Sequence, residues 1–434
     1  MKRVRSNKYL ALCTIGWNMQ CAVLSAGIVL QLNKSTRELS LGLIVIWLAS
    51  MFTRALWSNR NKKEHKQTNI LYGTSLGLAL IQARTITQRE DEEGITQFLL
   101  IAGALIAGSS LKTKEMKALL QWLGVTAASI SLILLSALVP DYSYSEQGMT
   151  QMYEKVFREG LGDINSLRFV LALLTAFSAT AAILSQNKLN RFFMASFTVI
   201  TYIAVIPTGS RMAMIAPIIA LIIALLIQGR SAIAKGEKHI WQTACWLGAF
   251  ACGLMSWKLV IEPDLAGGMT SDSLRVRIWL CWLKSITTGS NRFLHGFGHN
   301  NKHEIAKVCN DKALNLSIDS TITSHHHAHN TIVNIISHHG ILGLVAITIL
   351  AILLIRSLLK TRHEIKLIPG NLAKEERNLL AANAMTGVTL LICALSNTIY
   401  NQNQVLNILI GLSLAIPFCS ISAVILEQDR HSQI

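Results

Sequence analysis

Apolar segments of about 20 residues recur along almost the whole chain, and this recurrence limits the fold more than any other feature. About 20 apolar residues are what an α-helix needs to cross the hydrocarbon core of a bilayer. Inside lipid, only helices and closed barrels satisfy the backbone hydrogen bonds. The pattern predicts an all-α polytopic membrane protein, a single transmembrane domain over 1–434. The twelve predicted spans are 9–30, 39–57, 68–83, 95–111, 118–139, 168–185, 192–208, 212–228, 240–262, 340–359, 379–399 and 405–425.

The amino-acid composition supports a membrane protein and excludes a soluble enzyme and a disordered chain. Charged residues make up 15% of the chain and apolar residues 51%, and the mean hydropathy is +0.41. A soluble domain carries about 25% charged residues. The chain is therefore neither an ordinary soluble enzyme nor a disordered protein.

The net charge of +16 is explained by topology and needs no nucleic-acid partner. With the N-terminus in the cytoplasm, every loop that returns to the cytoplasm carries lysines and arginines, as the positive-inside rule requires. One of the opposite loops, 89–93, is acidic. Both termini are therefore expected in the cytoplasm. The cytoplasmic cations include Arg60, Lys62, Lys63, Lys66, Lys112, Lys114, Lys117, Lys188, Arg191, Arg230, Lys235, Lys238, Lys360, Arg362 and Lys366.

Two outer segments are long, 140–167 and 263–339. The second is inserted between spans nine and ten and is too long for a simple connector, so we expect it to be functional. Its stretch 272–285 has the apolar spacing of an amphipathic helix, with Asp272 or Ser273 as a candidate cap. We predict a large helical periplasmic loop.

Histidines are concentrated in this loop, where nine of the thirteen lie between 295 and 339. Three interpretations remain open: solvated surface, one catalytic or substrate-binding histidine, or a metal site. Spacing at i, i+4 favours metal binding on a helix face, yet no HExxH or similar signature accompanies it. We therefore assign no metal site.

His329 has the strongest case for chemistry. His329-Asn330 directly precedes an apolar helical stretch, and Gly340-Ile341-Leu342-Gly343 opens the next span. A helix N-terminus keeps a nearby imidazole neutral, which suits it to accept a proton from a hydroxyl. The alternative is that His329 or Asn330 only caps the helix.

Three arginines form the second candidate set. Arg211 lies in a very short outer turn, Thr208-Gly209-Ser210-Arg211, between two apolar spans. A cation there is costly and is a functional hypothesis by default, with snorkelling to the interface as the alternative. Arg275 and Arg277 begin the predicted amphipathic helix. Arginine pairs with phosphate oxygens in bidentate fashion, so the set suits a diphosphate.

Several activities are disfavoured by what the sequence lacks. It contains no phosphate-binding GxxxxGK[ST] loop and no GxSxG nucleophile motif. Gly296-Phe297-Gly298 is interpreted as a turn. The predicted spans lack a conspicuous acidic residue at depth, which makes proton-coupled transport the weaker hypothesis.

The eight cysteines form no CxxC, although Cys281 and Cys309 can pair if both face an oxidising compartment.

In combination, twelve spans, a long late outer loop, TGSR, SLRVRIW, GFG and HAHNTIVNIISHHGILG resemble the bacterial O-antigen ligase and polymerase superfamily. The specific motifs cover about 208–345. Within the superfamily the chain looks most like O-antigen ligase, a C-type glycosyltransferase of the inner membrane. The resemblance implies transfer of glycan from undecaprenyl diphosphate to lipid A-core on the periplasmic face, without nucleotide, metal or other cofactor.

The resemblance also implies roles for residues. Arg211, Arg275 and His329 match the family's essential arginines and histidine, and we expect them to be catalytic. Arg277, Asn330, His326 and His327 are expected to bind substrate, and either of the two histidines is an alternative to His329. Direct attack at the anomeric carbon would invert an α-linked donor. Two alternative functions remain: an O-antigen polymerase, and a His-rich exporter or metal permease.

Overall fold

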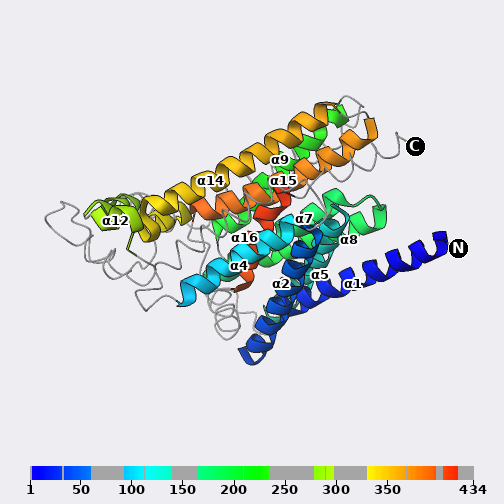
Figure 1. The fold of residues 1–434 in the computed structure, drawn as a ribbon, viewed down its shortest axis with the longest axis horizontal. Coiled ribbons are helices and arrows are strands. Elements are labelled where there is room, and N and C mark those ends of the chain that lie inside the picture. The colour runs from blue at the N-terminus through cyan, green and yellow to red at the C-terminus, as the bar shows by residue number, and fades with distance from the viewer. Residues whose placement is uncertain are drawn as a thin grey trace.

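The computed structural model describes residues 2–31, 34–59, 92–111, 113–138, 164–208, 210–233, 278–288, 290–297, 330–367, 370–396 and 404–418. Within these ranges every regular element is a helix (Figure 1). The long helices are α1 (Lys2–Leu30), α2 (Arg37–Asn59), α4 (Glu92–Ser109), α5 (Thr113–Leu138), α7 (Ile164–Leu184), α8 (Lys188–Val205), α9 (Arg211–Ile233), α14 (Thr331–Leu367), α15 (Gly370–Ser396) and α16 (Gln404–Ala415).

The all-helical prediction is confirmed over the described residues. These ten helices coincide with ten of the twelve predicted spans, while the spans at 68–83 and 240–262 lie outside the described residues. Five helical segments are long and apolar enough to cross a membrane by length and composition: Lys114–Ser136, Ser166–Leu184, Lys188–Thr208, Thr331–Ile349 and Arg377–Leu395. The total of twelve spans stays a prediction.

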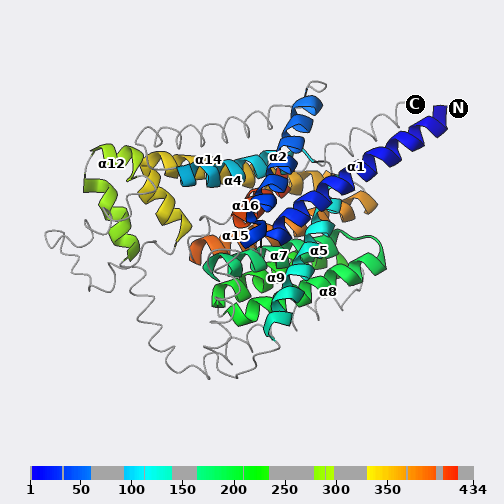
Figure 2. The ribbon, with the colours of Figure 1, turned by 90° about the horizontal axis from the view of Figure 1, so that it is seen from below.

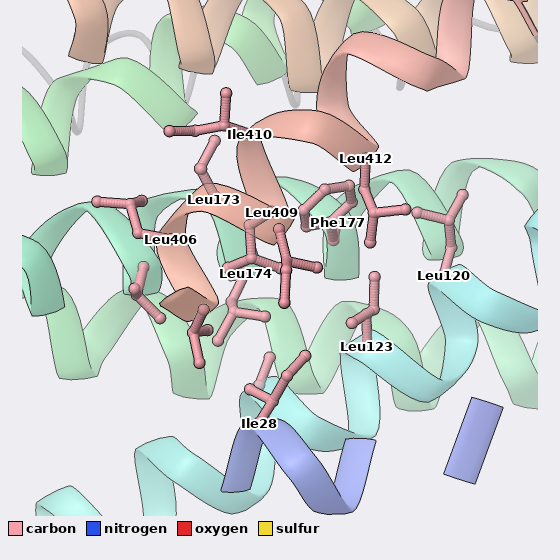
Figure 3. Close-up of a cluster of buried hydrophobic side chains, with 14 of the residues drawn as sticks. Ile28, Leu120, Leu123, Leu173, Leu174, Phe177, Leu406, Leu409, Ile410 and Leu412 are labelled. Atoms are coloured by element: carbon pink, nitrogen blue, oxygen red, sulfur yellow. The ribbon is translucent and has the colours of Figure 1, made fainter. Parts of the chain in front are cut away.

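Helix α7 is the centre of the bundle. Most of its residues are apolar, and 83% of its span is buried, against 22% for α8. Helices α5, α8, α9, α15 and α16 all pack on it, as expected for a largely apolar helix. Figure 3 shows Leu173, Leu174 and Phe177 of α7 enclosed by leucines of α16 and α5. The open side of α8 exposes Phe192 and Val199, which suits contact with lipid.

Helices α4 and α16 are packed through small residues. A Cβ added at Gly411 would meet the carbonyl oxygen of Ile101 and the side chain of Ala104, and one added at Gly108 would meet Ala415. Both helices therefore run in the same direction at close range. Such small-residue contacts replace the hydrophobic driving force that is missing between helices in lipid.

Helix α14 is two helical segments joined at Gly340, whose φ of 59° and ψ of −150° are not helical. Residues 331–339 form the first segment, and the long second segment begins after the glycine. Figure 2 shows the two segments meeting at an angle beside the short helix α12 (Ser290–His295). The tenth span was predicted to start at 340, the residue at which the chain changes direction. The candidate span found by length and composition begins earlier, at Thr331, so the predicted start stays a prediction.

Candidate functional site

The turn that carries Arg211 is built by two hydroxyl side chains. A short 3₁₀ helix, Ile206–Thr208, follows α8, and the buried Thr208 hydroxyl donates to the carbonyl of Val205 at 2.6 Å. Ser210 then caps α9, since its hydroxyl accepts the backbone N–H of Ala213 at 3.3 Å. Arg211 is thereby fixed as the first residue of α9.

A cation at a helix N-terminus is unfavourable by roughly 0.3–1 kcal/mol, because the backbone dipoles already make that end positive. The beginning of α9 therefore combines the positive end of the helix dipole with the positive charge of an arginine, Arg211. A bound anion would relieve this repulsion and use both features. The local sequence thus favours an anionic ligand at this end of α9.

Asn330 begins α14 in a similar way. Its side-chain Oδ1 accepts the backbone N–H of Ile332 at 2.9 Å and of Val333 at 3.2 Å. Its carbonyl accepts the N–H of Asn334 at 2.9 Å. The residue is 7% exposed. Asn330 is therefore the N-cap of α14, and His329 is the residue directly before this cap.

The same side chain joins two helices. Asn330 Nδ2 donates to the carbonyl oxygen of Leu395 at 3.2 Å. Leu395 lies at the C-terminal end of α15, where the last carbonyls of a helix lack partners within the helix. The side-chain amide of Asn330 therefore bonds two backbone N–H groups at the start of α14 and a backbone carbonyl at the end of α15.

The packing of α9 against α15 brings Arg211 to the same end of the bundle. The two helices are antiparallel: Gln228 donates to Asn378 at 2.8 Å, and Ala220, Ala224, Ala381 and Met385 share one buried cluster. From the Gln228–Asn378 bond, Arg211 and Leu395 are each about 17 residues away, or roughly 25 Å of helix. The first residue of α9 is therefore level with the Asn330–Leu395 bond.

A small packed unit covers the first segment of α14. Residues 278–285 are helical and continue into the 3₁₀ helix Ile286–Thr288, which confirms the second half of the predicted amphipathic helix. Ile278, Trp282, Phe297 and Val333 share a buried cluster. We call residues 278–288, 290–297 and 331–339 together the outer unit.

Polar contacts fasten the outer unit. The Ser337 hydroxyl lies 3.1 Å from the carbonyl oxygen of Trp282 and 2.9 Å from that of Val333. The backbone N–H of Phe297 donates to the carbonyl of Ser337 at 3.0 Å. The fully buried ring of His338 meets Trp282 edge-on, with centroids 5.7 Å apart. The guanidinium of Arg292 covers the Phe297 ring at 4.8 Å.

Two glycines allow the backbones of α12 and α14 to touch. Gly296 and Gly340 both have positive φ, 73° and 59°. A Cβ at Gly296 would strike the backbone of His338 and His339, and one at Gly340 would strike the carbonyl of Leu294. Of the predicted turn Gly296-Phe297-Gly298, the first two residues are described and form a bend, while Gly298 lies outside the described residues. Gly296 permits this close backbone approach.

Cys281 adds a covalent constraint to the outer unit. It is disulfide-bonded to a cysteine whose side chain lies outside the described residues, whereas Cys21 and Cys393 are thiols outside any disulfide. Disulfides persist in oxidising compartments. The bond therefore supports the expectation that the outer unit faces away from the cytoplasm.

The predicted site residues differ in how much the structure describes. Arg211 is described by its backbone and Asn330 by its full set of contacts, whereas Arg275, Arg277, His326, His327 and His329 lie outside the described residues. Their roles stay predictions. Chain continuity nevertheless ties two of them to the outer unit, because Arg277 directly precedes Ile278 and His329 directly precedes Asn330. Among the described residues no group of three metal-binding side chains occurs, but most of the clustered histidines are not among them.

Sequence reasoning missed several residues that shape the site. Ser210 was recognisable as a serine directly before an apolar helical run. Leu395 acts through its backbone carbonyl, so the residue type at this position gives no indication of its role in the sequence. Ser337 and His338 were hidden inside an apolar stretch, and only the fold of the outer unit reveals their contacts.

The described residues form a helical bundle with several apolar helices, as in a polytopic membrane protein, and the N-termini of α9 and α14 lie at the same end of α15. Residues 195–348 match the family model of O-antigen ligase. This segment contains the C-terminal part of α8, all of α9, the outer unit and the kink of α14, and it supports membership of the O-antigen ligase superfamily, as the motifs predicted. The family implies a glycosyltransferase-like membrane enzyme with lipid-linked glycan substrates. No curated protein matches the chain.

Proposed function

We propose that the chain is an O-antigen ligase, which transfers glycan from undecaprenyl diphosphate to lipid A-core at the periplasmic face of the inner membrane. The observation that carries this proposal is that two helix N-termini lie at the same end of one helix, α15. The start of α9, with Arg211, and the start of α14, next to His329, lie at the same end of α15. A family match over the same segment supports it.

The donor's diphosphate is the leaving group, and its negative charge increases as the glycosidic bond breaks. Fixed cations that face this charge stabilise the transition state. In our proposal Arg211 and Arg275 supply it, and Arg277 contributes to donor binding. The positive end of α9 adds to the same field. No metal ion or nucleotide is required for this step.

His329 acts as the general base in our proposal. It accepts the proton of the acceptor hydroxyl while that oxygen attacks the anomeric carbon, so the carbon inverts as the bond to diphosphate breaks. A neutral imidazole is needed, and a position just before the N-terminus of α14 favours the neutral form. His326 and His327 are assigned to the acceptor glycan.

A lipopolysaccharide gel of a deletion strain tests the proposal. Without the gene, we expect bare lipid A-core and long polymer still on its carrier, and the wild-type gene should restore the ladder. Lipid A-core that bears a single repeat unit would instead identify a polymerase. An unchanged ladder would contradict both activities and favour an exporter.

A further inference from the structure

We infer that Asn330 is a positioning residue, which holds His329 in place by joining the N-terminus of α14 to the C-terminus of α15. The inference rests on the proposed function, since it concerns the geometry of the same site. It assigns Asn330 a role that differs from direct contact with substrate.

Hydrogen bonding supports this role. Both side-chain ends of Asn330 are used inside the protein: Oδ1 accepts two backbone N–H groups of α14, and Nδ2 donates to Leu395. The side chain is almost fully buried. A residue whose oxygen already accepts two bonds is poorly suited to accept another from a sugar hydroxyl.

The two bonds to α14 and the one to α15 have separable consequences. The bonds to Ile332 and Val333 start the helix, as any N-cap does. The bond to Leu395 decides where this start lies relative to α15, and therefore relative to the start of α9. His329 is covalently attached to Asn330, so the bridge sets the position of its backbone. A 1 Å misplacement of a reacting group can cost on the order of 100-fold in rate.

Two substitutions remove the bridge and keep the cap. In Asn330→Ser, the hydroxyl still caps the helix but is too short to reach Leu395. In Asn330→Asp, the carboxylate caps at least as well and gains from the positive helix end, but it has no N–H to donate. Both proteins should fold, and the loss of the hydrogen bond to the Leu395 carbonyl should lower their thermal midpoint to a limited extent.

Asn187 offers a matched control at a different helix. It caps α8 with the same geometry, accepting the N–H of Leu189 at 2.9 Å, and it joins no second helix through a described contact. Asn187→Ala should therefore lower stability by roughly 0.5–2 kcal/mol and leave transfer per folded molecule unchanged.

The experiment measures kcat and the KM for lipid A-core with purified full-length protein in proteoliposomes containing the lipid-linked donor. We expect both Asn330→Ser and Asn330→Asp to lose about 10- to 100-fold in kcat, with little change in KM and a fall in thermal midpoint similar to that of Asn187→Ala, which keeps its kcat. Full kcat in both variants would overturn the inference. A raised KM with unchanged kcat would also overturn it, because it would indicate direct substrate contact.

His329→Ala separates failure of this inference from failure of the proposed function. If His329→Ala is inactive while the Asn330 variants keep full kcat, only the positioning role is wrong. If His329→Ala keeps full activity, the assignment of the base is wrong, and the inference falls with it.

Discussion

At the scale of single residues, two small polar side chains begin the helices that matter most for the proposed chemistry. Ser210 caps α9 one residue before Arg211, and Asn330 caps α14 one residue after His329. Caps define where a helix begins. Here they also fix where the candidate cation and the candidate base leave the backbone, which links local sequence to the site.

Replacing His329 with alanine should remove the general base. General base catalysis contributes about 10²–10⁴-fold, so we expect transfer to fall by that factor while the protein still enters the membrane. Transfer is measured with purified protein, and expression by immunoblot of membranes. The neighbouring His326 and His327, changed separately, should act on acceptor KM; a larger kcat loss at either would move the base to that residue.

Arg211 tests the electrostatic part of the proposal. Arg211→Ala should lower kcat by about 10²–10³-fold, the usual effect of removing one donor to a developing negative charge. Arg211→Lys keeps the charge but not the bidentate geometry, and should recover only part of the activity. The exposed Arg356 of α14 provides a control. Equal losses in Arg211→Ala and Arg356→Ala would count against a specific role.

At the scale of elements, the outer unit depends on the contact between α12 and the kink of α14. Gly340→Ala would force a side chain into positive φ and against the Leu294 carbonyl. Strain at such a position costs on the order of 1–3 kcal/mol, so we expect a lower thermal midpoint and reduced transfer.

Gly387 provides the control for this experiment. It lies within α15, and a Cβ there would meet nothing within 4 Å. Alanine is favoured over glycine in helices by roughly 0.5–1 kcal/mol, so Gly387→Ala should keep or raise the midpoint. If both glycine variants behave alike, the close contact at Gly340 does not support the outer unit.

The Cys281 disulfide makes a second prediction about the outer unit. We predict Cys309 as its partner. In the denatured, non-reduced protein, maleimide should label the thiols of Cys21 and Cys393, which form no disulfide, but not Cys281. Loss of a native disulfide typically costs about 2–5 kcal/mol, so Cys281→Ser should lower the thermal midpoint. Labelling of Cys281 without reductant, read by peptide mass spectrometry, would contradict the pairing.

Secondary structure was largely readable from the sequence because helices that cross lipid must be long and apolar. The predicted spans overlap the described helices, and Gly340 was expected at the start of a span. The contacts of the outer unit were not readable. They depend on backbone approach at Gly296 and on the buried ring of His338, and neither produces a periodic signal.

At the scale of the whole molecule, long-range hydrogen bonds join helix ends that the topology predicted from loop charges places on the same side of the membrane. Gln31 donates to Gln404 at 3.2 Å, and both were predicted at the outer end of their helices. Gln228 and Asn378, predicted at the inner end, also bond to each other. Both bonds therefore join helix ends that the predicted topology places on a common side, and Figures 1 and 2 show these helices packed in one bundle.

The tertiary fold places the starts of α9 and α14 at the same end of α15. The motifs at 208–211 and 329–343 identified the family and named the residues, yet they are about 120 residues apart in the chain. Nothing in their spacing indicates that α15 connects them. Only the antiparallel packing of α9 on α15 and the Asn330–Leu395 bond reveal the common end.

Transfer by the purified chain in proteoliposomes tests the central claim most directly. The vesicles would contain labelled glycan on undecaprenyl diphosphate together with lipid A-core, without nucleotide and with a chelator present. We predict that label moves to lipid A-core and that undecaprenyl diphosphate is released, with no transfer by His329→Ala. Label that stays on the carrier as a longer glycan, or transfer that requires a metal ion, would contradict the account.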